Sequence, residues 1–287
     1  MRIILVQFTG LIFCLLFIKC NWHPVNEYQF LLRQEKLITI EDFHTNGQQL
    51  VNNYINDLDS LSQSDIRAVI DETSNACVRI EIKSSKYPAR SPEVITQSIY
   101  GTGVLFNSGS FILTSQHLFD HVQAFDDMNI QDVFGNQLET KVIEKESVIN
   151  DSQTEYDDWV IIKNLSEHQN YPSIYPGKAN VGNMVYIFGY PEGMGLDPND
   201  RVERSTSYSE VKSLKPVVTI GKIINTDPLI IKPVIGSSIT GGMSGGPVVN
   251  EEGILIGIIT ASRYISFEDK TILTYSVTGV MEFDSFF

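Results

Sequence analysis

The pattern of apolar and polar positions changes near Cys77. From there onward, short runs of Val, Ile, Thr, Tyr and Phe alternate with turn residues such as Gly, Asn, Asp and Pro. This alternation predicts an all-β sandwich or barrel built from short strands. With 287 residues, 42% of them hydrophobic, the chain is long enough and apolar enough to bury a sizeable core.

The chain before Cys77 has a different spacing. Apolar residues recur at helical intervals over Gln48–Leu58, and a second helix is expected over Ser64–Thr73. We therefore expect a short helical N-terminal extension, residues 21–65, ahead of the β-rich part.

A glycine-rich run near the C-terminus carries a candidate nucleophile. The run Thr240–Asn250 places Ser244 among four glycines, directly before an apolar strand. Glycines allow close backbone approach, so the amides of Gly242 and Ser244 could point into one pocket and bind an oxyanion. The alternative is a simple glycine-rich turn between two strands.

The order of residues along the chain restricts the possible base. All five histidines, at positions 23, 44, 117, 121 and 168, precede Ser244. Gly242–Gly246 matches the G-x-S-x-G motif, but in α/β-hydrolases the histidine follows the serine. That fold is excluded, while the orders His, Asp, Ser and Asp, His, Ser both remain open.

His117 is the candidate base because of its setting. The runs Gly101–Phe106 and Gly109–Phe119 flank a short turn and predict a β-hairpin whose second strand ends at His117. A surface histidine is one alternative. A metal-binding pair with His121 is another, but no HExxH pattern or third ligand accompanies it, so we expect no metal and no cofactor.

Asp158 is the candidate third member. Asp157 and Asp158 directly precede the apolar run Trp159–Ile162, and Asp158 is the one at the start of the strand, where the chain enters the core. A shielded carboxylate there could orient an imidazole. Alternatively, the acidic pair only marks the end of a loop.

These three motifs, in this order, resemble those of the trypsin-like serine proteases of the chymotrypsin fold. The resemblance runs from about Ile66 to the end of the chain. It implies two six-stranded antiparallel β-barrels, about residues 74–170 and 181–283, within a protease domain of residues 66–287. Tyr171–Gly177 would connect the barrels, and the catalytic cleft would lie between them.

The resemblance also implies roles for individual residues. His117, Asp158 and Ser244 would form the triad, with Gly242 and Ser244 as the oxyanion hole. The substrate pocket would be lined by Ser238, Ile239, Thr240, Thr260, Ala261 and Ser262. None of these pocket residues is charged, so we expect small or medium apolar side chains at the cleavage position, and protein or peptide substrates.

Within the family, the chain most resembles the high-temperature-requirement (Deg) proteases and the glutamyl endopeptidases. Val185–Gly193 and Val218–Ile224 are similar to the Deg pattern of a Gly-x-Pro turn followed by a Gly-Ile-Ile strand. Digestive family members carry aspartate before the serine, where this chain has Met243. We therefore expect no activation by insertion of a new N-terminus, and some other means of ordering the oxyanion hole. We also expect no PDZ domain after the barrels.

The N-terminus and the charge bear on location and partners. Residues 1–20 predict a signal peptide or, if uncleaved, a membrane anchor over residues 3–18. A secreted or extracytoplasmic protein would then keep only Cys77 and no internal disulfide. The net charge of −14 argues against nucleic acid and anionic membrane surfaces as partners. The oligomeric state is left open.

Two alternatives concern function itself. Residues 21–65 could be a pro-segment that blocks the cleft, although no clear processing site marks its end. The whole chain could also be a catalytically silent, protease-like binding or regulatory module.

Overall fold

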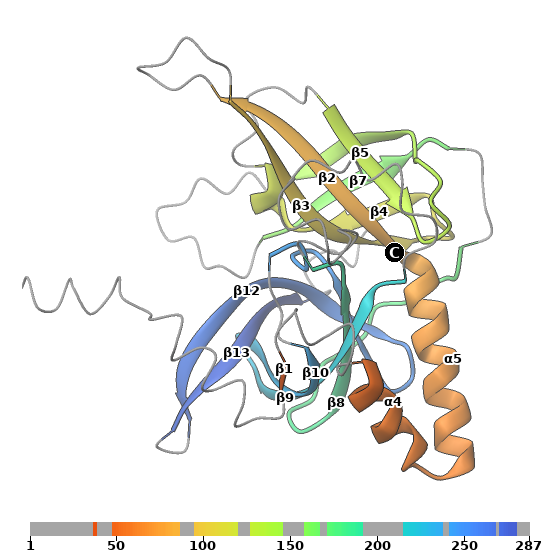
Figure 1. Ribbon diagram of the computed structural model, residues 1–287, viewed down its shortest axis with the longest axis vertical. Coiled ribbons are helices and arrows are strands. Elements are labelled where there is room, and N and C mark those ends of the chain that lie inside the picture. Colours follow the sequence, from red (N-terminus) through yellow and green to blue (C-terminus); the bar gives the residue numbers. More distant parts are fainter. Residues whose placement is uncertain are drawn as a thin grey trace, which may run out of the picture.

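The fold consists mainly of two curled antiparallel β-sheets, the first and the second barrel, one above the other (Figure 1). The computed structural model describes residues 37–38, 48–86, 95–119, 127–145, 158–166, 171–191, 215–237, 241–267 and 270–279. The all-β prediction is confirmed.

The first sheet has six strands in the order β5-β2-β3-β4-β7-β6. Their bounds are β2 Cys77–Lys86, β3 Ile95–Phe106, β4 Phe111–Thr114, β5 Asp127–Asp132, β6 Thr140–Lys145 and β7 Val160–Asn164. The expected hairpin before His117 is confirmed, because β3 and β4 pair from Gly103 with Thr114 to Phe106 with Phe111. Asn107, Ser108 and Gly109 turn the chain with positive φ angles.

The second sheet contains six antiparallel strands that close on themselves through a pairing of β9 with β10. Their bounds are β8 Met184–Gly189, β9 Val217–Thr226, β10 Leu229–Ser237, β11 Pro247–Asn250, β12 Leu255–Phe267 and β13 Lys270–Gly279. A seventh, two-residue strand, β1 Leu37–Ile38, pairs in parallel with Gly236 and Ser237 of β10. The sequence did not predict this strand.

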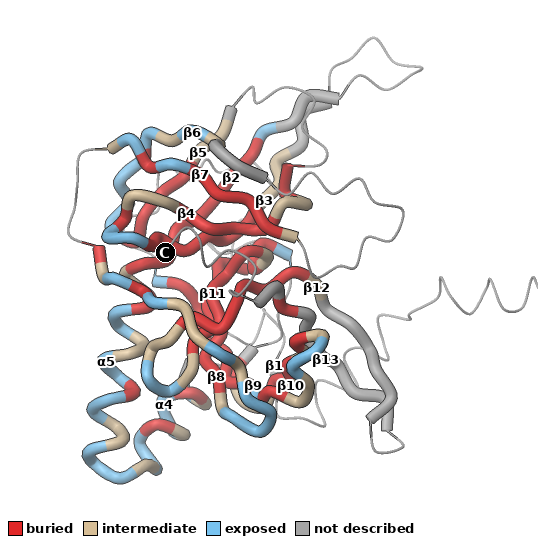
Figure 2. Tube along the Cα trace, turned by 180° about the vertical axis from the view of Figure 1, so that it is seen from behind, coloured by how far each residue is buried: buried red, intermediate tan, exposed pale blue. Residues whose placement is uncertain are grey.

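Strand β2 shows how the first sheet is buried on both faces. Val78, Ile80 and Ile82 alternate along it and are at most 1% exposed, as a period of two requires for a strand facing a core. The intervening Arg79 and Glu81 are also buried. Arg79 lies over the ring of Tyr190 from the second barrel, 5.6 Å from its centroid. The polar face of β2 is therefore covered as well as its apolar face. Figure 2 shows the buried strands as the red interior of the molecule.

Two helices precede the first strand, α4 Gln48–Asn56 and α5 Ser60–Ala76. The sequence predicted both, but placed the second at Ser64–Thr73. It begins earlier because the Asp59 side chain accepts hydrogen bonds from the amides of Leu61 and Ser62, as an N-cap does. α5 runs beside the second barrel and enters β2 directly at Cys77 (Figure 1). Cys77 is free, and its burial raises the pKa of its thiol.

Within the described residues, no helix combines the length and the apolar character that crossing a bilayer requires. The predicted leader, residues 1–20, lies outside those residues.

A buried carboxylate organises one end of the first barrel. Asp132, 2% exposed, accepts hydrogen bonds from the amides of Phe134 and Asn136, from the Asn136 side chain and from the Tyr171 hydroxyl. Burial, together with the bond to Asp132, raises the pKa of Tyr171, so the phenol stays protonated and donates. Asp132 thereby ties the turn after β5 to Tyr171, which lies between β7 and β8.

We predict that Asp132→Ala lowers the free energy of unfolding by about 3 kcal/mol or more, because it strands several buried donors at once. Urea denaturation followed by fluorescence measures this loss. The matched control is Asp57→Ala, at an exposed position, which should change stability by less than about 0.5 kcal/mol. Equal effects of the two substitutions would contradict the structural role of Asp132.

Candidate active site

The register of two paired strands brings His117 next to Asp158. Thr114, the last residue of β4, pairs with Val160, the first residue of β7. Because the strands are antiparallel, the residues after Thr114 and those before Val160 leave the sheet at the same end. His117 lies there in the short 3-10 helix η2 Gln116–Phe119, rather than on the strand itself, and Asp158 lies two residues before β7.

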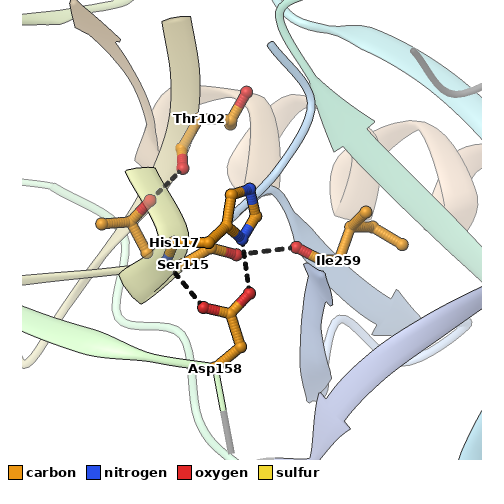
Figure 3. Close-up of polar contacts among 6 residues, drawn as sticks. Thr102, Ser115, His117, Asp158 and Ile259 are labelled. Atoms are coloured by element: carbon orange, nitrogen blue, oxygen red, sulfur yellow. Dashed lines mark hydrogen bonds and ion pairs between the residues drawn. The ribbon is translucent and has the colours of Figure 1, made fainter. Parts of the chain in front are cut away.

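Asp158 holds His117 with both of its carboxylate oxygens (Figure 3). Oδ2 is 2.6 Å from the ring atom Nδ1 of His117, and Oδ1 accepts a hydrogen bond of 2.8 Å from the backbone N–H of the same residue. The Asp158 side chain is 18% exposed, whereas that of His117 is 41% exposed. A shielded carboxylate therefore fixes the orientation of a ring that still reaches solvent. Its other nitrogen points away from Asp158 (Figure 3).

The chain around Ser244 forms a tight turn that needs its glycines. Gly242 and Gly245 have φ angles of +89° and +83°, where other residues are strained. A Cβ at Gly245 would overlap Thr114 Oγ1 and the carbonyl oxygen of Thr102. Met243 is fully buried in the core of the second barrel, while Ser244 remains partly exposed. The turn thus buries Met243, the uncharged residue before the serine, and leaves Ser244 partly exposed.

This serine turn, Gly242–Gly245, is attached to the first barrel. The Thr102 amide of β3 donates to the Ser244 carbonyl, at 2.8 Å. The Ile259 carbonyl of β12 accepts bonds from the amide of Gly245, at 2.7 Å, and from the hydroxyl of Ser115, at 3.0 Å (Figure 3). Ser115 lies two residues before His117, so one carbonyl connects the serine turn with the segment that carries the histidine.

The amides proposed as oxyanion donors belong to the serine turn. Within the described part of the chain, neither the N–H of Gly242 nor that of Ser244 has a hydrogen-bond partner. Among the described residues, no hydrogen bond joins the Ser244 hydroxyl to the His117 ring. Such bonds are often formed only once substrate is bound.

The expected substrate pocket is described in part. Thr260 is buried and Ala261 is partly exposed, next to an irregularity in the pairing of β12 with β13. Ser262 lies on β12, but its side chain is outside the description, as are Ser238, Ile239 and Thr240 altogether. His121 and Asp157 also lie outside the described residues. Elsewhere in the described chain, no group of three or more potential ligand side chains could hold a metal ion.

Sequence reasoning missed the residues that position the serine turn. The sequence placed Thr102, Thr114 and Ser115 in the predicted hairpin and did not single out Ile259, yet each takes part in the attachment. The only signal was Thr102 itself, a polar residue between two glycines in an otherwise apolar run.

Comparison with known proteins identifies the family. Residues 101–258 match the model of the trypsin-like peptidase domain, which is more than half of the chain. The chain therefore belongs to the trypsin-like peptidase domain family, as the three motifs had indicated. The match begins within β3 and ends within β12, so it covers His117, Asp158 and Ser244.

The relatives agree with the resemblance to the Deg branch. Two proteins named serine protease HtrA-like, from Staphylococcus aureus strains RF122 and USA300, are each 24% identical over 214 residues, which is 72% of this chain. The chain spans about a quarter of the length of these curated relatives, 26%. The crystal structure of the serine endoprotease from Yersinia pestis is 20% identical with a TM-score of 0.48, covering 74% of this chain and 62% of that one.

We predict that Gly245→Ala destabilises the fold more than Gly253→Ala, although both glycines have similar positive φ angles, +83° and +77°. A Cβ at Gly253 finds its nearest neighbour, Val69 Cγ2, at 3.6 Å, so only backbone strain of about 1–2 kcal/mol is expected. Gly245→Ala adds an overlap with the first barrel, worth about 1–3 kcal/mol more. Urea denaturation of both variants measures the difference. Equal losses would show that the serine turn is not packed against β3 and β4.

Proposed function

We propose that this protein is a serine endopeptidase that hydrolyses peptide bonds through a Ser-His-Asp triad and an acyl-enzyme intermediate. The observation that carries the proposal is the two-point hold of Asp158 on His117, through the ring nitrogen Nδ1 and the backbone amide. A carboxylate on Nδ1 leaves Nε2 as the basic nitrogen, which is the tautomer a general base needs. Membership of the trypsin-like peptidase domain family supports the same reaction.

In the proposed mechanism, His117 Nε2 removes the proton from the Ser244 hydroxyl as its oxygen attacks a peptide carbonyl. The amides of Gly242 and Ser244, which have no partners among the described residues, donate to the oxyanion of the tetrahedral intermediate. His117 then protonates the leaving amine, and water attacks the acyl-enzyme with the same histidine as base. Asp158 stabilises the imidazolium at both stages.

The expected substrates are proteins or peptides, cleaved after small or medium apolar side chains. This preference rests on the uncharged pocket residues. Two of them, Thr260 and Ala261, directly follow Ile259, whose carbonyl accepts a hydrogen bond from Gly245 of the serine turn. A secreted or extracytoplasmic location stays a prediction that depends on residues 1–20.

We predict that a fluorophosphonate probe labels the wild-type protein and that Ser244→Ala abolishes labelling. Hydrolysis of fluorogenic casein should fall by about 10⁴-fold or more, because no other group can form the acyl-enzyme. Circular dichroism confirms that the variant is folded. A folded wild type that is neither labelled nor active would instead support the silent binding module.

Asp158→Asn should lower kcat by about 10³–10⁴-fold with little change in KM, since the amide no longer favours the reactive tautomer or stabilises the imidazolium. Initial rates on a fluorogenic peptide with alanine at the cleavage position measure both constants. The matched control is the adjacent Asp157→Asn, which should retain activity within about threefold. If the two variants lose activity equally, or Asp157→Asn loses more, the third member of the triad has been wrongly chosen.

A further inference from the structure

Thr102 lies at the point where the two barrels meet around the serine turn. It is fully buried on β3 and uses every polar group that it has. Its N–H donates to the Ser244 carbonyl, and its own carbonyl accepts from Thr114 Oγ1, at 2.6 Å. Its hydroxyl donates to the Gly242 carbonyl, at 2.8 Å, and accepts from the Tyr190 amide, at 2.9 Å.

These bonds hold the serine turn at two places. The carbonyls of Gly242 and Ser244 lie on either side of Met243, and Thr102 binds both of them, one through its side chain and one through its backbone. Fixing these carbonyls fixes the planes of the peptides that follow Gly242 and Ser244. The peptide that carries the Ser244 amide lies between these two fixed planes, and the Gly242 amide is attached to the Cα where the first of them begins, so the rotation of the Gly242–Ser244 segment is restricted.

We propose that the Thr102 hydroxyl is a positioning residue for the oxyanion hole, holding the Gly242–Ser244 segment in the conformation that presents its amides to the substrate. The inference rests on the proposed function. It supplies the other means of ordering the oxyanion hole that we expect from the sequence, given Met243 in place of an aspartate. Met243 offers no charge for an ion pair, and its side chain is buried in the second barrel. The ordering group comes from the first barrel.

An apolar side chain of the same size cannot replace the two hydrogen bonds of the Thr102 hydroxyl. The hydroxyl has a donor on one side and an acceptor on the other, so a valine of similar shape would leave the Tyr190 N–H and the Gly242 carbonyl without their partner. A serine would keep both bonds and lose only a methyl group. Hydroxyl chemistry and side-chain volume can therefore be separated experimentally.

The test compares Thr102→Val, Thr102→Ser and Thr102→Ala in the full chain, well below the unfolding temperature. The second-order rate of fluorophosphonate labelling reports the oxyanion hole, because the phosphonyl oxygen occupies it. Thr102→Val should lower this rate, and kcat on the alanine peptide, by about 10- to 100-fold, less than the roughly 10²–10³-fold cost of removing an oxyanion donor. KM should change little, and Thr102→Ser should stay within about threefold of wild type.

A merely structural role predicts a different order. If volume alone mattered, Thr102→Val would be the least affected variant, and the labelling rate would follow the folded fraction. The control Thr73→Val changes another buried threonine, on α5, and should lower the unfolding temperature without changing the labelling rate. If Thr102→Val fails to fold, the pair Thr102→Ser and Thr102→Ala, which differ in one hydroxyl, decides the question: a rate at least tenfold lower for alanine supports the proposal, and equal rates overturn it.

The possible failures can be told apart. A labelled wild type with Thr102→Val labelled equally fast overturns the positioning role and leaves the peptidase assignment intact. A folded wild type that is not labelled overturns the proposed function, and this inference with it.

Discussion

The attachment of the serine turn to the first barrel is the constraint on which the rest of the site depends. Ser244 is carried by the second barrel and His117 by the first, so their relation is only as fixed as the contact between the barrels. At the site itself, the Thr102 amide donates to the Ser244 carbonyl, and the Ser115 hydroxyl donates to the Ile259 carbonyl, which also accepts from the Gly245 amide. Displacing the turn would break these buried bonds together, which makes the arrangement cooperative.

Strand pairing within the first barrel places His117 next to Asp158. Neither residue lies within a strand, but each follows or precedes one by only a few residues, and the two strands are neighbours in one sheet. The register of β4 with β7 sets the distance between His117 and Asp158. This register is fixed, because a one-residue slip would turn the buried side chains to the opposite face of the sheet. The core of the first barrel therefore enforces the geometry of the edge that carries His117 and Asp158.

The sequence predicted the elements well and their connections poorly. Strand alternation and the hairpin before His117 could be recognised because they are local, with periods of two and a glycine-containing turn. The early start of α5 could also have been found, since Asp59 is a good N-cap. The parallel pairing of β1 and the bonds of Thr102 join residues far apart in the chain, and no local pattern encodes them; Thr102 and Gly242, for example, are 140 positions apart.

The direction of the bonds at Thr102 explains why so small a side chain can specify a single conformation. The Tyr190 amide can only donate and the Gly242 carbonyl can only accept, so the hydroxyl proton has one useful orientation. A turn that rotated the Gly242 carbonyl away would leave a buried acceptor and an unused donor, each costly without water. An ion pair is attractive over a wide range of angles, whereas a hydroxyl that both donates and accepts satisfies both bonds in only one orientation. A neutral turn bearing Met243 can thus be ordered as sharply as a charged one, provided that the first barrel supplies the hydroxyl.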